Sequence, residues 1–204
     1  MNTSGQLGPA MIGQRILPLL FIIALHSTIF SQVTNDDDIT RVSDPQLIES
    51  LASKDIEVAN AAIEEVLKRG ERLIPLLIQK KGDQRFVLGR LTRSENASTI
   101  VFTPSTNSRR NSKLLREGKL ITVEVAALYL ITAIFYNDLY ISQTPYLTDL
   151  SLAPEKRRSA NTEEVVEKAW ESTEAWFQKL EATGLEKLRK ENEYPFRKGK
   201  VRFW

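Results

Sequence analysis

Apolar residues recur at helical spacing after residue 44. Asp44 and Pro45 are residue types that begin helices, so a first short helix is predicted there with Asp44 as its N-cap. A second helix is predicted to begin after Asp55 and to end at Gly70. Its apolar residues repeat every three or four positions, as one buried helix face requires: Ala59, Ala62, Ile63, Val66 and Leu67.

A nearly uninterrupted apolar run over residues 123–136 predicts a helix with Thr122 as its N-cap. A helix that is apolar almost all round is expected to be buried on most sides. Membrane insertion is the alternative, but Glu124 and Thr132 interrupt the run, which is shorter than the roughly 20 residues that span a bilayer. We therefore expect this helix at the centre of the core.

The clearest amphipathic pattern follows Asn161, which we expect to cap a long helix with Glu164 completing a capping box. The apolar stripe of this helix consists of Val166, Trp170, Thr173, Phe177 and Leu180, widened by Trp176. Trp170 and Phe177 are predicted to anchor the helix on the one centred at Leu130. A stripe of this kind is also compatible with a partner-binding face.

Gly184 is expected to end the long helix, and a last short helix then completes a helical domain over residues 44–192. Irregular segments rich in Ser, Thr, Asn and Arg separate the helices. The longest is the loop 82–119, in which residues 98–103 form the one β-like run. The predicted fold class is therefore all-α, a helical-hairpin domain with long irregular insertions and little or no sheet.

A further pattern lies between residues 51 and 77, where a third short helix is predicted from Leu73. The pattern consists of Asp55, Val58, Ala61, Ala62, Leu67, Gly70, Ile74, Pro75 and Leu77. The segment resembles a HEAT-type helical repeat, in which small alanines let paired helices approach closely. Such repeats usually form arrays, because one unit cannot bury its own apolar face. The resemblance implies a helical scaffold that binds other macromolecules rather than a particular reaction.

Residues 1–31 have the plan of an export signal. Arg15 is their only charged residue, and it precedes an apolar run over residues 16–25. This arrangement is typical of a signal peptide, while the same run left uncleaved would be an N-terminal membrane anchor. Residues 32–43 follow as an acidic linker around Asp36–Asp38. We therefore expect an extracytoplasmic protein, either periplasmic or secreted.

The composition limits the chemistry of the mature domain. The chain has no cysteine and a single histidine, His26, next to the predicted signal's apolar run. Histidine-based triads, thiolate nucleophiles and zinc sites with sulfur or imidazole ligands are thereby excluded from the mature domain. The formal net charge of +2 lacks the strong basic excess of nucleic-acid-binding proteins. The sequence predicts no cofactor, no metal site and no nucleic-acid partner.

Basic residues gather inside the loop 82–119, and basic and aromatic residues alternate in a tail over residues 193–204. The cluster is also compatible with a solvated loop. The tail is also compatible with docking on its own domain or with peripheral contact to an anionic membrane. The candidate partner surface comprises Arg109, Arg110, Lys113, Arg116, Arg197, Arg202, Phe203 and Trp204.

These observations favour an exported, non-catalytic helical protein that binds another macromolecule, most simply a protein, in a scaffold or adaptor role. One alternative is a carboxylate-based hydrolase that acts on an envelope polymer, with Glu124 as the only acid in the apolar centre. A membrane-tethered accessory protein is the other. Tyr129, Tyr136 and Tyr140 are candidates to line a pocket, although tyrosines more often pack their rings into the core.

Overall fold

Helices dominate the part of the chain that the computed structural model describes, which confirms a mostly all-α fold. The described residues are 39–88, 90–92, 99–101, 121–142, 145–157 and 159–203. Their α-helices are α2 (Asp44–Ser50), α3 (Ile56–Arg69), α4 (Ile74–Ile78), α6 (Val123–Tyr136), α7 (Glu163–Thr183) and α8 (Leu185–Lys190). Two 3₁₀ turns, η1 (Gly70–Leu73) and η2 (Pro154–Lys156), accompany them.

Two small antiparallel sheets complete the described elements. Strand β1 (Arg90–Thr92) pairs with β2 (Thr99–Val101), which lies inside the predicted β-like run. Strand β3 (Leu147–Asp149) pairs with β4 (Val201–Phe203), so that Leu147 stands opposite Phe203. The second sheet joins the middle of the chain to its tail, a connection that the sequence did not predict.

The predicted caps of the first two helices differ in their outcome. Ser43, not Asp44, is the N-cap of α2, and it forms a capping box with Gln46. Asp44 lies inside the helix instead, where its carboxylate accepts a 2.7 Å hydrogen bond from Arg69. The cap predicted for α3 is confirmed, because the Asp55 carboxylate accepts hydrogen bonds from two backbone N–H groups of the first turn. Gly70, at φ +65°, ends α3 as predicted.

Arg69 holds the segment that precedes α2 against the domain. Its guanidinium is buried and donates hydrogen bonds to the carbonyl oxygens of Ile39, Thr40 and Val42. It also pairs with Glu65 at 2.8 Å. Because Ile39 itself is only 3% exposed, residues 39–43 are packed on the domain rather than extended from it.

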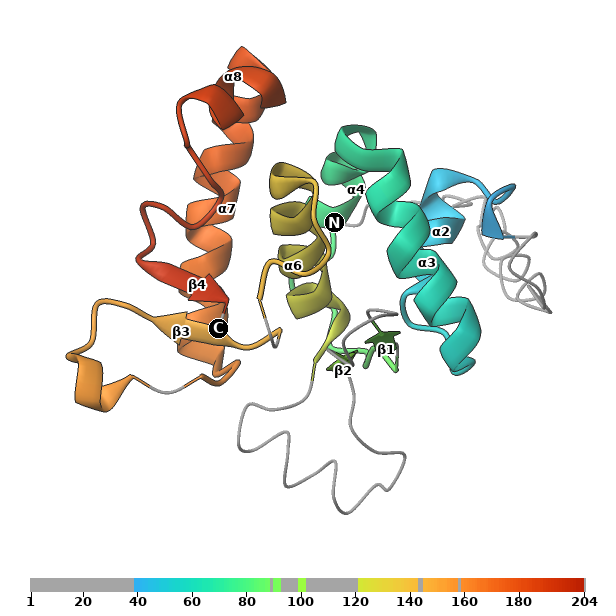
Figure 1. Cartoon of the computed structure of the whole chain (residues 1–204), viewed down its shortest axis with the longest axis horizontal. Coiled ribbons are helices and arrows are strands. Elements are labelled where there is room, and N and C mark those ends of the chain that lie inside the picture. The colour runs from blue at the N-terminus through green and yellow to red at the C-terminus, as the bar shows by residue number, and fades with distance from the viewer. Residues whose placement is uncertain are drawn as a thin grey trace, which may run out of the picture. The chain divides into compact units, whose positions relative to one another are not determined.

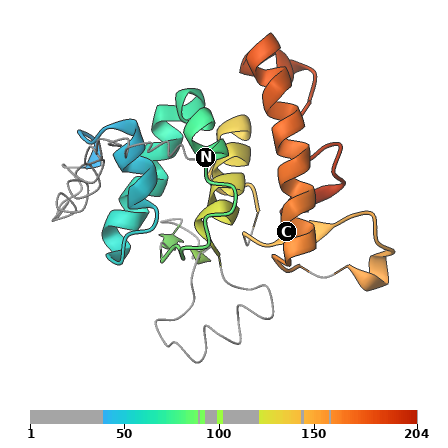
Figure 2. The same ribbon diagram turned by 180° about the vertical axis from the view of Figure 1, so that it is seen from behind.

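Helix α6 occupies the centre of the core, as its apolar run predicts. Every residue from Val123 to Phe135 is buried. The helix contacts α3 and α4 on one side and α7 and α8 on the other, and both views show it between α4 and α7 (Figures 1 and 2). Arg189 of α8 donates two 2.7 Å hydrogen bonds to the last carbonyls of α6, those of Ile134 and Phe135. Among the described residues, no helix combines the length and the hydrophobicity that crossing a membrane requires.

Helix α7 packs against α6 through aromatic side chains. The Trp170 ring is fully buried, as predicted, and Phe177 is half-buried against the core. Trp176 makes the ring contact with α6, since its centroid lies 6.1 Å from that of Phe135. The predicted cap is wrong by one residue: Thr162 is the N-cap, whereas the Asn161 side chain bonds the backbone of residues 145 and 147.

The tail docks on α7 through a small set of specific contacts. The Trp176 indole N–H donates to the carbonyl of Glu193 at 2.7 Å. The Ser172 hydroxyl donates to the carbonyl of Pro195 at 2.8 Å and accepts from the N–H of Gly199 at 3.1 Å. Because these bonds fix the tail, β4 lies beside β3.

Candidate functional site

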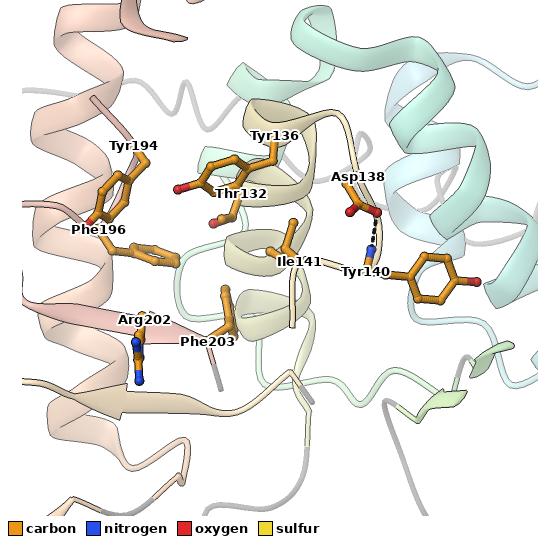
Figure 3. Close-up of a pocket in the computed structure, with 9 residues that line it drawn as sticks. All are labelled: Thr132, Tyr136, Asp138, Tyr140, Ile141, Tyr194, Phe196, Arg202 and Phe203. Atoms are coloured by element: carbon orange, nitrogen blue, oxygen red, sulfur yellow. Dashed lines mark hydrogen bonds between the residues drawn. The ribbon is translucent and has the colours of Figure 1, made fainter. Parts of the chain in front are cut away.

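A pocket of about 870 Å³ lies among the described residues and is shown in Figure 3. This volume falls within the roughly 300–1,000 Å³ of ligand sites. Its lining comes from three parts of the chain: α6, the turn that follows α6, and the docked tail. The lining residues are Thr132, Tyr136, Asp138, Tyr140, Ile141, Tyr194, Phe196, Arg202 and Phe203.

The first wall forms where α6 ends. Tyr136 is the last residue of the helix, and Asn137 takes a left-handed conformation (φ 53°) that turns the chain back along the pocket. Asp138 then accepts a 2.8 Å hydrogen bond from the backbone N–H of Tyr140. The buried Tyr129 hydroxyl donates to the carbonyl of Leu139, which ties the turn to α6. A short local motif therefore positions this wall.

Burial raises the pKa of the Tyr129 hydroxyl, so this group stays protonated as the donor that the turn requires. Tyr129 is not among the described residues that line the pocket. Its ring packs edge-on against the lining residue Phe203, with 5.0 Å between the centroids. Of the three tyrosines that the sequence offered as pocket residues, Tyr136 and Tyr140 therefore line the pocket.

The second wall consists of tail residues. The Phe196 and Phe203 rings meet edge to face with 5.4 Å between their centroids, and both are buried. Tyr194 precedes them and faces Tyr136 in Figure 3. Because the pairing of β3 with β4 fixes Phe203, and Ser172 fixes the backbone of Pro195, the fold holds these rings in place.

Tyrosine hydroxyls and two opposite charges supply the polar groups of the pocket. Tyr136 is 48% exposed, and partial burial raises its pKa, with a further contribution from nearby Tyr194. The hydroxyls of Tyr136 and Tyr194 both lack a hydrogen-bond partner among the described residues. Asp138 and Arg202 lie on opposite sides of the pocket (Figure 3). The pocket therefore presents hydrogen-bond donors between apolar rings, with a charge of each sign at its margins.

The predicted partner surface is only partly described. Arg109, Arg110, Lys113, Arg116 and Trp204, with the predicted signal peptide 1–31, lie outside the described residues.

The described residues of that surface, Arg197, Arg202 and Phe203, lie in different structural environments. Arg202 and Phe203 both line the pocket, and Phe203 is 9% exposed because its ring packs against those of Tyr129 and Phe196. Arg197 is exposed, and its guanidinium binds Glu193 at 3.0 Å within the tail. The sequence missed Tyr194 and Phe196 as pocket residues, because no local pattern shows that the tail meets α6.

Glu124, the acid of the apolar centre, has a structural role in the described residues. Glu124 accepts hydrogen bonds from the backbone N–H of Gly82 and from the side chain of Gln84, so it braces the start of α6. Of the described residues that line the pocket, Asp138 is the one carboxylate, whereas glycoside hydrolysis uses two at about 5–10 Å. No group of three or more acidic or histidine side chains suited to a metal occurs among the described residues.

Comparisons of the chain with protein-family models, with curated proteins and with solved structures gave no match. The resemblance to a HEAT-type repeat therefore stays a prediction from the residues.

Proposed function

We propose that this protein binds another macromolecule, most simply a protein, and does no chemistry on it. The aromatic pocket between α6 and the tail is the observation that carries the proposal. Concave sites with apolar walls and a few placed polar groups are the usual form of binding sites. Tyrosine is suited to such contacts, because its ring supplies apolar area and its hydroxyl supplies a hydrogen bond.

Export of the protein is part of the same proposal. The support is the order of residues in the sequence, where Arg15 precedes an apolar run and acidic residues follow at Asp36–Asp38. Cell fractionation, with N-terminal sequencing of the purified protein, tests it. We expect the protein outside the cytoplasm with a new N-terminus near Gln32, and an intact Met1 on cytosolic protein would contradict export.

Site-specific photo-crosslinking in the native cell tests the binding function. A benzoylphenylalanine residue placed at Tyr136, which is 48% exposed at the pocket, is expected to form a covalent adduct with the partner. The matched control places the same residue at Glu171, an exposed position on α7 outside the pocket. Mass spectrometry identifies the adduct. An adduct at both positions, or at neither, would contradict a pocket-directed binding function.

A further inference from the structure

The pocket lining has a chemical bias that indicates what kind of segment fits it. Resting on the binding function proposed above, we propose that the pocket takes an extended, proline-rich segment of the partner in the polyproline II conformation. Such a segment combines flat apolar rings with backbone carbonyls that make no internal hydrogen bonds. Three features of the pocket match it: its donors, its rings and its two charges.

Two tyrosine hydroxyls are the hydrogen-bond donors that match such a segment. In Figure 3 the Tyr136 hydroxyl points toward the ring of Tyr194, whose own hydroxyl points away from Tyr136. Neither hydroxyl has a hydrogen-bond partner among the described residues. A tyrosine hydroxyl is protonated at neutral pH and can therefore donate, and partial burial raises the pKa of Tyr136 further. A proline-rich segment offers many carbonyl acceptors and few N–H groups, because proline has none. Donors in the pocket and acceptors in the ligand are therefore complementary.

The acceptors of the described lining include Asp138 and Thr132. Asp138 accepts from the backbone N–H of Tyr140 at 2.8 Å. The Thr132 hydroxyl donates its proton to the carbonyl of Leu128, at 2.9 Å. Each of these oxygens keeps lone pairs that can accept further hydrogen bonds, as do the tyrosine hydroxyls. A sugar oligomer is therefore included as a competitor in the test below.

The rings supply the apolar part of the fit. Phe196, Phe203 and the ring of Tyr136 line the same cavity, and aromatic-lined grooves are the recurrent receptor for proline-rich segments. The tail contacts to Ser172 and Trp176 hold this wall before any ligand arrives. A preformed groove and a preformed ligand helix both lower the entropy cost of association.

The two charges indicate which peptide binds best. Asp138 and Arg202 stand on opposite sides of the pocket (Figure 3). A segment with a basic residue at its Asp138 end and an acidic residue at its Arg202 end is complementary to both. Charges at the rim of a site select the partner and its orientation more than they raise affinity.

Fluorescence anisotropy with the full chain tests the inference. The probe is a fluorescein-labelled polyproline peptide of about ten residues, enough for several polyproline II turns, with Asp at one end and Arg at the other. A Gly–Ser peptide of the same length and end charges is the matched ligand. We expect the polyproline probe to bind at least about tenfold more tightly, because its conformation is preformed.

Conservative variants connect the binding to the pocket. Tyr136→Phe and Tyr194→Phe each remove one donor and keep the ring, so each is expected to weaken the probe by about threefold to tenfold. Tyr146→Phe, outside the pocket lining, is the matched control and is expected to leave the Kd unchanged. Thermal melts of all three variants identify any loss that comes from unfolding. Asp138→Asn is expected to weaken the Arg-bearing probe and to spare an uncharged polyproline peptide.

Three results would overturn the inference: equal binding of the two peptides, an unchanged Kd in both pocket variants, or displacement of the probe by an N-acetylglucosamine oligomer. A crosslink at Tyr136 without polyproline binding would reject the peptide class and leave the binding function standing. Absence of both would reject both.

Discussion

Helix α3 and the docked tail, residues 193–203, are fixed in the structure by opposite means. The helix carries a periodic apolar stripe, a local cap at Asp55 and a glycine end at Gly70. The tail has no repeat, and its place depends on Ser172, on Trp176 and on the pairing of β4 with β3. The first is specified by neighbours in the sequence and the second by residues far away.

This difference predicts where a substitution most affects the stability of the fold. The apolar stripe of α3 makes many similar contacts, so one conservative substitution in it changes the free energy of unfolding little. The tail is attached by buried side chains of Phe196, Val201 and Phe203, by the pairing with β3, and by a few specific contacts to α7 at Ser172 and Trp176. Because the tail forms one wall of the pocket, damage there is expected to reach the binding site as well.

Trp170→Ala is expected to have the largest effect, because it removes a fully buried ring from the helix on which the tail docks. Such changes typically cost about 3–5 kcal/mol. Chemical denaturation measures the loss of unfolding free energy. Trp170→Phe is the control and is expected to cost less, since the lost indole N–H has no hydrogen-bond partner among the described residues. An unchanged free energy with lost crosslinking at Tyr136 would mean that this stripe is an interaction surface.

Gly199→Ala tests the close contact between the tail and α7. An added Cβ would lie 2.9 Å from the Cβ of Ser172 and 3.0 Å from the carbonyl oxygen of Lys168. We expect a cost of about 1–3 kcal/mol, as for other overpacked sites, and faster proteolysis of the tail. Gly70→Ala is the matched change at the end of α3, where nothing lies within 4 Å and only the positive φ resists it. It is expected to cost about 1–3 kcal/mol and to spare the tail.

A pair of serine variants compares a hydroxyl that joins two elements with one that stays within its own helix. Ser172→Ala leaves the carbonyl of Pro195 and the N–H of Gly199 without their partner, and we expect a loss of about 1–3 kcal/mol. Ser50→Ala removes a bond only to the carbonyl of Gln46 in the preceding turn. Its unfolding free energy is expected to change by less than about 0.5 kcal/mol. Equal losses in the two variants would contradict a special role of the tail contacts.

Acid titration is expected to act at Asp149 in β3. Burial acts to raise the pKa of Asp149, but hydrogen bonds from Lys168 and Ser151 outweigh it and lower the pKa to about 2. A depressed pKa stabilises the folded state above the ordinary value of 3.8, and this contribution is lost as the pH falls toward 2. Thermal melts between about pH 5 and 2 should show up to about 2 kcal/mol of this loss, and Asp149→Asn should flatten that part of the profile. An identical profile in the variant would contradict it.

Much of the helical framework could be predicted from the sequence, because its signals are local. The apolar run gave the bounds of α6, and Gly70 and Gly184 end their helices as predicted. The misplaced caps have tertiary causes. Asp44 pairs with Arg69, and Asn161 bonds the chain before and at the start of β3, so each side chain serves a distant partner instead of its own helix.

Only one wall of the candidate site, the wall at the end of α6, could be predicted from the sequence. Tyr136 and Tyr140 follow from their position at the end of an apolar helix, but the alternation of basic and aromatic residues around Tyr194 and Phe196 does not show which part of the fold the tail contacts. Their place depends on β3 and β4, which have three residues each, too few for any sequence signal. The basic pattern of the tail was visible in the sequence, whereas the inward packing of Phe203 was not.

The pairing of Leu147 with Phe203 also has a consequence for the order in which the molecule folds. The contacts of α2, α3 and α4 close short loops, while this pair closes a long one, and the entropy of loop closure must be overcome before such a contact gives any stabilisation. The sheet of β3 and β4 is therefore expected to form late. The pocket requires Phe203 in place, so a partially folded chain with its helices intact is expected to lack a complete site. Ligand binding is therefore expected only after the sheet of β3 and β4 has formed.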